Sequence, residues 1–207
     1  MPSSQSEWDE KFRLAAEVPA AEPAEILCEL LPLLPAGQAL DLACGAGRNA
    51  LFLAECGRHV TAVDWSEPGL RILETRAQGK KIPLCRIQKL AESGRTKRAG
   101  IDLFHSDLEK IHLPDHSYDL IVCIRYLQRS LFPQICRALR PGGMLLYETF
   151  TRAQLDFEGG PKDPAHLLKP GELREAFPEL CVLFYRELRA GQGIASLAAQ
   201  KPGKQKN

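Results

Sequence analysis

The 207-residue sequence lacks a long apolar run, a paired-cysteine motif and a strong net charge. No apolar stretch approaches the roughly 18 residues of a membrane-spanning helix, and residues 1–10 lack the basic-then-apolar order of a secretion signal. A formal net charge of +1 provides no overall attraction to nucleic acid or to an anionic membrane. We therefore expect a cytoplasmic protein that does not bind membranes.

The cysteine and histidine patterns do not favour a metal site. The seven cysteines are odd in number, widely spread and never in a C-x-x-C pair, which favours reduced thiols over a disulfide framework. His105, His112 and His116 invite a metal interpretation. However, Pro114 would break a helix that aligned His112 with His116, and cysteine or carboxylate partners at ligand spacing are missing. We expect no bound metal.

The order of apolar segments predicts alternating helices and strands in one domain, because the chain is long enough for one sizeable core but too short for a two-domain dehydrogenase. Strands are expected at 39–43, 59–63, 101–105, 118–124 and 144–147, followed by a hairpin of 181–188 with 194–200. Helices are expected at 22–34, from 48 to before Gly57, after Ser66, at 131–139 and at 170–177.

Residues 39–50 organise the chain, because an apolar strand leads into an acidic residue, a glycine-rich turn and a helix. Gly45 and Gly47 allow positive φ and a close approach of the backbone to a ligand, and the following helix points free N–H groups at the same place. With Ala50 they match G-x-G-x-x-A, which a dinucleotide-binding dehydrogenase also shows. Asp41 at the end of the strand would repel a pyrophosphate but attract a ligand that carries an amino group and a sulfonium.

This stretch resembles motif I of the class I S-adenosylmethionine (SAM)-dependent methyltransferases, an acidic residue followed by Gly-x-Gly. In that family the loop contacts the methionine part of SAM, so the resemblance implies SAM as the cofactor. Cys44 replaces one of the usual loop glycines. We interpret it as a small buried thiol in a tight turn and not as a nucleophile.

Two further acidic residues follow expected strands. Asp64 lies 19 residues after Gly45, the distance at which the second strand of a doubly wound sheet delivers an acid to ribose hydroxyls. Capping of the next helix is the alternative role, although Ser66 is the better cap. Trp65 either lies along the adenine or simply packs. Family members keep an acidic residue near Asp107 that accepts a hydrogen bond from the adenine amino group.

The candidate cofactor-binding residues lie at the carboxyl ends of the expected strands or in the turns and helix starts that follow them. They are Asp41, Ala43, Cys44, Gly45, Gly47, Asn49, Asp64, Trp65, Ser66, Asp107, Leu108 and Ile124.

The residues that follow the apolar strand 118–124 are candidates for contact with the methyl acceptor. Arg125 and Tyr126 follow it directly, and Glu148 follows the next strand, so these three are the candidate catalytic residues. Glu148 would take a proton from a neutral acceptor, and Arg125 or Arg129 would bind an acidic one. The ring of Tyr126, Trp65 or Trp8 would face the sulfonium. An Arg–Glu pair at the pocket rim is an equal alternative. The Asn/Asp-Pro-Pro-aromatic motif of many nucleic-acid nitrogen methyltransferases is absent, whereas the Arg-Pro-Gly-Gly turn at 140–143 is typical of class I methyltransferases.

Residues 71–98 are basic, with nine Lys or Arg against Glu74 and Glu92. No strand is evident there, so we interpret residues 79–100 as an insertion. It is either a solvated surface excursion or a basic patch for an anionic substrate or RNA.

The resemblance covers about residues 37–200 and implies a doubly wound, Rossmann-like α/β fold with a seven-stranded sheet that ends in an antiparallel hairpin. Residues 1–36 form a helical segment, in which Trp8 and Phe12 either pack on the surface or act as a lid. Residues 157–169 are a candidate substrate lid, and residues 201–207 a flexible tail.

Within the family, the motifs look most like small tellurite-resistance-type and thiopurine-type enzymes. This likeness implies methyl transfer from SAM to a small-molecule acceptor of thiol or chalcogen type. An RNA methyltransferase using residues 71–98 and a non-catalytic module that binds SAM or nicotinamide nucleotides remain alternatives. The acceptor and the oligomeric state stay open.

Overall fold

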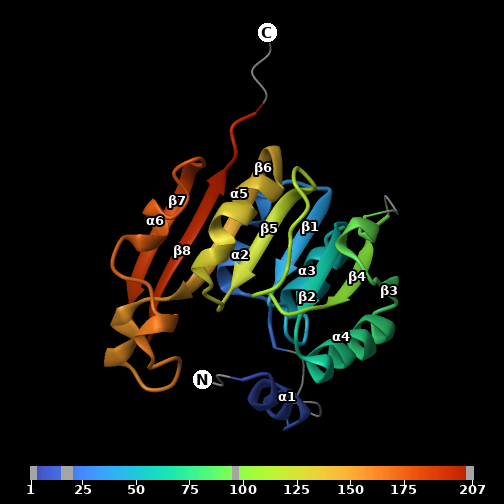
Figure 1. Ribbon diagram of the computed structural model, residues 1–207, viewed down its shortest axis with the longest axis horizontal. Helices are drawn as coiled ribbons and strands as arrows, with labels where there is room; N and C mark the ends of the chain where they lie inside the picture. The colour runs from blue at the N-terminus through green and yellow to red at the C-terminus, as the bar shows by residue number, and fades with distance from the viewer. Residues whose placement is uncertain (1–3, 15–20, 95–97, 204–207) are drawn as a thin grey trace. The chain divides into compact units, whose positions relative to one another are not determined.

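The computed structural model describes residues 4–14, 21–94 and 98–203. Its residues divide into two compact units, an N-terminal unit of residues 2–112 and a C-terminal unit of residues 113–207. Each unit contains four of the strands drawn in Figure 1. Within the described residues the strands therefore number eight, one more than the sequence predicted.

The N-terminal unit is built on parallel strands, as the alternation of strands and helices predicted. They are β1 (Gln38–Leu42), β2 (His59–Asp64), β3 (Leu84–Arg86) and β4 (Gly100–His105), paired in the order β3-β4-β2-β1. Every residue of β2 is buried, which explains why its sequence does not alternate between polar and apolar side chains. Strands β1 and β2 each carry an acidic residue at or next to the carboxyl end, Asp41 in β1 and Asp64 in β2.

Strand β3 corrects the interpretation of residues 79–100 as an insertion. Leu84–Arg86 pairs in parallel with β4, so the basic stretch contains a regular edge strand of the fold. Gly100 makes this pairing possible, because a Cβ there would lie 2.9 Å from the carbonyl oxygen of Pro83. The neighbouring Ile101 donates its N–H to that same oxygen at 2.8 Å.

The main helices of this unit begin where the sequence predicted. Helix α3 (Arg48–Glu55) follows the glycine turn, and α4 (Glu67–Gly79) follows Ser66, whose hydroxyl caps it by accepting from the N–H of Gly69. Both helices pack on β2 and β4. The predicted helix at 22–34 is shorter, because α2 (Glu25–Leu30) gives way to the 3₁₀-helix η1 (Leu31–Leu33) at Pro32. A further helix, α1 (Gln5–Leu14), packs on α4.

The C-terminal unit ends in the antiparallel hairpin that the sequence predicted. Its strands are β5 (Tyr118–Ile124), β6 (Leu139–Phe150), β7 (Cys181–Arg189) and β8 (Gly193–Gln200), paired in the order β5-β6-β8-β7. Strands β5 and β6 are parallel, whereas β8 is antiparallel to both of its neighbours. Helix α5 (Phe132–Ala138) packs on β6, and the short α6 (Glu172–Glu175), which was predicted to span 170–177, packs on β8.

The core of this unit is partly aromatic. The ring centroids of Phe132 and Phe177 lie 4.9 Å apart, and both rings contact Tyr147 of β6. The predicted turn at 140–143 lies inside β6 as an irregularity, since Leu139 pairs with Tyr118 but the next pair is Met144 with Leu120.

Lys201 is fixed, although the sequence placed it in a flexible tail. Its backbone N–H donates to Gly143 at 2.8 Å, and its ammonium donates to the carbonyls of Cys136 (2.6 Å) and Leu139 (2.8 Å) at the end of α5. A cation at this place satisfies carbonyls that lack partners within the helix. Residues 204–207 lie outside the described residues.

None of the helices in the described ranges combines the length and the apolar composition that crossing a membrane requires.

Candidate cofactor and acceptor sites

Asp41 is a buried carboxylate with one unsatisfied oxygen. Its side chain is almost fully enclosed, at 1% exposure, and accepts a hydrogen bond from the backbone N–H of Ala50. Within the described part of the chain, its Oδ2 atom has no hydrogen-bond partner. Burial, followed by repulsion from the carboxylate of Asp64, raises the pKa of Asp41 to about 7. Since a buried unpaired acceptor is costly, this atom marks a place for a ligand donor.

The glycine turn after β1 has the geometry that the sequence predicted. Gly45 has φ +55° and Gly47 has φ +78°, both in the left-handed region. A Cβ on Gly45 would lie 2.8 Å from Cζ of Phe12, and one on Gly47 would lie 2.2 Å from Cδ1 of Leu73. Ala43 adopts φ +57° in the same turn, which is strained for a residue with a Cβ.

Asp64 joins this turn to the one after β2. Its Oδ2 accepts from the N–H of Gly45 at 2.7 Å, and its Oδ1 accepts from the N–H of Ser66 at 2.9 Å. Burial raises the pKa of the Asp64 carboxyl, against the opposing effect of these backbone donors. Each carboxylate oxygen has a second lone pair, so Asp64 can accept hydrogen bonds from ligand hydroxyls in addition to these two backbone donors.

Helix α1 lies against the same two turns. The ring of Phe12 contacts both Gly45 and Gly69, and Trp8 stacks on it with ring centroids 5.8 Å apart. The hydroxyl of Ser66 donates to Asp9 of this helix at 2.6 Å. The segment in which the sequence left a surface or a lid role open is therefore packed on the candidate cofactor turn. Residues 15–20, which follow it, lie outside the described residues.

Several candidate cofactor residues have structural contacts of their own. Cys44 is buried, and burial raises the pKa of its thiol well above the usual value, which supports its interpretation as an inert thiol. Asn49 accepts from the N–H of Ala24 at 2.9 Å through its side-chain oxygen. The carbonyl of Trp65 is bonded to the side chains of Gln5 and His105, each at 2.7 Å.

The remaining three lie at the ends of later strands. Asp107 follows β4, and its carboxylate accepts from the N–H of Glu109 at 2.9 Å, the contact that contributes most to lowering its pKa. Leu108 is buried beside it, and Ile124 is the buried last residue of β5.

In the C-terminal unit, Arg125 and Glu148 come together as an ion pair. The Arg125 Nε atom lies 3.6 Å from Oε1 of Glu148. The backbone N–H of Arg125 donates to the backbone carbonyl of Glu148 at 2.7 Å. The Arg125 guanidinium lies over the ring of Phe150, 4.6 Å from its centroid. Arg125 has φ +64°, a strained backbone directly after β5.

Glu148 is also fixed by a residue that the sequence did not single out. Its Oε2 atom accepts from the hydroxyl of Ser196 at 2.8 Å, and both side chains are buried. The antiparallel register of β6 with β8 places Ser196 opposite Glu148. Tyr126 donates its hydroxyl to Gln128 at 2.6 Å, while its carbonyl accepts from the hydroxyl of Tyr147 at 2.9 Å.

The positive charge of residues 71–98 is partly neutralised within the N-terminal unit. Arg86 donates to both carboxylate oxygens of Glu74, at 2.6 and 2.8 Å, and to Glu67 at 2.9 Å. Arg71 pairs with the same Glu67 at 3.0 Å.

No group of three or more His, Cys, Asp or Glu side chains placed to hold a metal ion occurs within residues 4–14, 21–94 and 98–203. All seven cysteines are free thiols.

An α/β fold with a terminal antiparallel hairpin, an acid at the end of β1 and a glycine turn after it define the class of SAM-dependent methyltransferases of class I. A family model described as a methyltransferase domain matches residues 40–147, which is more than half of the chain. The chain therefore belongs to this methyltransferase-domain family.

One sequence relative carries a methyltransferase name, and one solved structure shares the fold. A probable S-adenosylmethionine-dependent methyltransferase of Mycolicibacterium smegmatis is 27% identical over 142 residues, covering 66% of this chain and 46% of its own. The solved structure of TehB from Haemophilus influenzae superposes with a TM-score of 0.68 at 20% identity, covering 94% of this chain and 67% of that one. An uncharacterised protein of Schizosaccharomyces pombe is 27% identical over 180 residues, covering 73% of this chain and 53% of its own. The chain thus spans about half the length of these two sequence relatives.

S-adenosylmethionine is the cofactor that this family implies, and the residues present fit it. The unpaired Oδ2 atom of Asp41 offers an acceptor for an amino group, and Gly45 and Gly47 give the loop after β1 the left-handed φ angles that glycine favours. A pyrophosphate would instead meet the buried carboxylates of Asp41 and Asp64.

Proposed function

We propose that this chain transfers a methyl group from S-adenosylmethionine to a small-molecule acceptor whose attacking atom is a thiolate sulfur or a related chalcogen. The choice of acceptor rests on Glu148, the only candidate base among the three proposed catalytic residues, because both of its carboxylate oxygens already have partners. Its two oxygens already face Arg125 and Ser196. An acceptor that arrives as an anion needs no base, whereas an alcohol must lose its proton as it attacks.

The N-terminal unit supplies the proposed cofactor contacts. Asp41 accepts from the cofactor amino group through its Oδ2 atom, and its ionised form attracts the positive charge of that group. The backbone around Gly45 and Gly47 lies against the methionine part, and Asp64 accepts from the ribose hydroxyls while it holds the N–H of Gly45. When bound, S-adenosylmethionine supplies an electrophilic methyl group, which an acceptor lone pair takes as the carbon–sulfur bond breaks.

The C-terminal unit supplies the proposed acceptor contacts at the carboxyl ends of β5 and β6. Arg125 is held at a strained φ by its contacts with Glu148 and Phe150, which fixes its position. Positioning of this kind is the main contribution that a protein makes to a reaction with an already activated donor, and it is worth on the order of 7–11 kcal/mol.

The test is a methyl-transfer assay with radiolabelled S-adenosylmethionine and small thiols, with selenite and tellurite assayed in parallel. We expect thiol methylation whose rate rises with pH as the acceptor thiol ionises, around its usual pKa of about 8.5. Failure to methylate any thiol, selenite or tellurite, with methylation of an alcohol or amine instead, would refute the choice of acceptor.

The variant Glu148→Gln tests whether Glu148 acts as a general base or only holds Arg125 in place. If Glu148 only holds Arg125, the variant keeps the pH profile of thiol methylation and changes its rate by less than about tenfold, because proton transfer by a general base is worth roughly 10²–10⁴-fold. Loss of activity by about 10²-fold or more, together with loss of the pH dependence, would make Glu148 the base. Ser196→Ala is the matched control, since it removes one hydrogen bond to Glu148 but leaves the carboxylate.

The alternative of an RNA methyltransferase has less support. Arg71 and Arg86 of the basic stretch are paired with carboxylates, so their charge is not free for phosphates. Arg95 and Lys97 lie outside the described residues. RNA binding that weakens with salt and with neutralisation of Arg95, Lys97 and Arg98 would support this alternative.

A further inference from the structure

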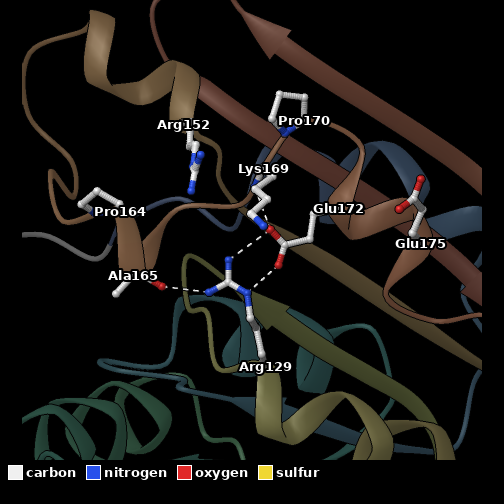
Figure 2. Close-up of a pocket in the computed structure, with 8 residues that line it drawn as sticks. All are labelled: Arg129, Arg152, Pro164, Ala165, Lys169, Pro170, Glu172 and Glu175. Atoms are coloured by element: carbon white, nitrogen blue, oxygen red, sulfur yellow. Dashed lines mark hydrogen bonds and ion pairs between the residues drawn. The ribbon is translucent and has the colours of Figure 1, made fainter.

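The C-terminal unit contains a cavity of about 730 Å³ that none of Arg125, Tyr126 and Glu148 lines. It is drawn in Figure 2, and its polar lining consists of Arg129, Arg152, Lys169, Glu172 and Glu175. The residues come from the segments that follow β5 and β6 and from the stretch 164–175.

The cavity lies where a ligand of this fold class is expected. Arg129 comes five residues after β5 ends at Ile124, and Arg152 comes two residues after β6 ends at Phe150. Since β5 and β6 are parallel, their carboxyl ends lie at the same edge of the sheet. Ligands of open α/β sheets bind beyond this edge.

One of the three cations of the cavity is a structural clamp. The guanidinium of Arg129 donates to both oxygens of Glu172, at 2.5 and 3.1 Å, and to the carbonyls of Ala165 (3.0 Å) and Leu167 (3.1 Å). Its charge is balanced by Glu172, and its donors tie the 165–172 wall to the end of β5, as the dashed lines of Figure 2 show. The wall is therefore held in place without a ligand.

The other two cations have fixed backbones and available side chains. The N–H of Arg152 donates to the carbonyl of Leu168 at 2.9 Å, and the N–H of Lys169 donates to Glu172 at 2.7 Å. Within the described part of the chain, no hydrogen bond or ion pair engages the guanidinium of Arg152 or the ammonium of Lys169, although the Lys169 charge contributes to lowering the pKa of Glu172. In Figure 2 the Arg152 side chain points from its segment toward the space beside Ala165, and Glu175 lies on the opposite side.

We infer that this cavity binds the carboxylate of the methyl acceptor, with Arg152 and Lys169 as the binding cations. The guanidinium offers paired N–H donors that match a carboxylate, and the ammonium adds a positive point charge. This inference rests on the proposed function in so far as the bound molecule is the acceptor. It narrows the substrate class to small anionic molecules that carry a carboxylate besides the attacking atom.

The first test compares two thiols of similar size that differ in charge. Isothermal titration of the full chain, saturated with S-adenosylhomocysteine, would use 3-mercaptopropionate and its neutral analogue 3-mercapto-1-propanol. We expect the anion to bind roughly tenfold or more tightly, since a hydrogen bond to a charged group contributes a factor of this size. We also expect added salt to weaken binding of the anion and not of the neutral thiol.

The variant Arg152→Gln combined with Lys169→Gln should remove this preference. Both side chains are exposed, so the double variant is expected to keep its melting temperature. Arg174→Gln is the matched control, because Arg174 is an exposed arginine of α6 that does not line the cavity. The control should bind 3-mercaptopropionate as the unmodified chain does.

Equal affinity for the two thiols, no binding of the anion, or unchanged anion binding by the double variant would each overturn the inference. Methyl transfer separates this failure from failure of the proposed function. Binding of 3-mercaptopropionate without its methylation would refute the thiol acceptor and leave the carboxylate site in place. Methylation of both thiols with equal KM would support the thiol acceptor and refute the carboxylate site.

Discussion

At the scale of one residue, the buried side chain of Asp41 should lower the stability of the folded protein when it ionises. Its pKa is raised from the ordinary value of 3.8 to about 7 by burial, so the folded chain holds this proton more tightly than the unfolded chain does. The folded state is therefore favoured at a pH below the ordinary pKa. That advantage is lost as the pH rises toward about 7, where the buried side chain ionises.

Asp41→Asn should stabilise the ligand-free protein at about pH 8, on the order of 1–3 kcal/mol, and change stability much less at about pH 5. The same variant should bind S-adenosylhomocysteine roughly ten- to a hundredfold more weakly, because it loses the charged acceptor. Urea unfolding at both pH values and isothermal titration measure the two effects. An equal change in stability at both pH values would contradict the raised pKa, because it would mean that Asp41 of the folded protein is already ionised at about pH 5.

His59, the first residue of β2, should make the stability of the fold depend on pH in a second way. Its Nε2 lies 2.7 Å from Oδ2 of Asp102, and its Nδ1 lies 2.9 Å from the carbonyl of Arg98. Both ring nitrogens thus face acceptors, which suits the protonated ring. The hydrogen bond with Asp102 raises the pKa of His59 above the ordinary 6.5, against the opposing effect of burial.

Because the folded-state pKa is raised, this stabilisation is fully present below about pH 6.5 and is lost as the pH rises through the folded value. His59→Gln should lower the free energy of unfolding by about 1–3 kcal/mol at about pH 6, where the protonated ring makes both bonds, and by less at about pH 9. Chemical denaturation across this range is the measurement. A deficit that grows with pH would mean that the folded ring is neutral.

At the scale of an element, helix α3 is bounded by two glycines that test the cofactor turn. Gly47 at its start has φ +78°, and Gly57 after its end has φ +84°. A Cβ on Gly47 would meet Leu73, whereas a Cβ on Gly57 would meet nothing within 4 Å. The two positions share the backbone strain and differ in the steric conflict.

Gly47→Ala should therefore destabilise the protein by about 1–3 kcal/mol more than Gly57→Ala, since only the former displaces a buried side chain of α4. It should also weaken S-adenosylhomocysteine binding, whereas Gly57→Ala should leave it unchanged. Thermal unfolding and titration of both variants provide the comparison. Equal destabilisation would indicate that Leu73 moves aside without cost.

At the scale of the whole molecule, the sequence predicted the elements whose signals are local. The acid at 41, the glycine turn, the cap at Ser66, the strand 118–124 and the final hairpin all depend on neighbouring residues. Strand β3 was missed because it is only three residues long, is partly or fully exposed and is recognised by its pairing with β4. For this reason the predicted number of strands, seven, was one too low, whereas the predicted fold class was correct.

The contacts that complete the candidate site are long-range, and sequence alone does not give them. Ser196 reaches Glu148 through the register of β6 with β8, and Asp9 reaches Ser66 across 57 residues. The cavity around Arg152 and Lys169 likewise forms only when the 164–175 stretch folds against the segment after β6. The residue types were visible in the sequence, but their partners were not.

Isothermal titration of the unmodified protein with S-adenosylhomocysteine, with NADH titrated in parallel, distinguishes a methyltransferase cofactor site from a dinucleotide site. We expect binding of S-adenosylhomocysteine in the micromolar range and no binding of NADH, because the unpaired oxygen of Asp41 would accept from an amino group and would repel a pyrophosphate. Binding of NADH without binding of S-adenosylhomocysteine would contradict the assignment of the cofactor site.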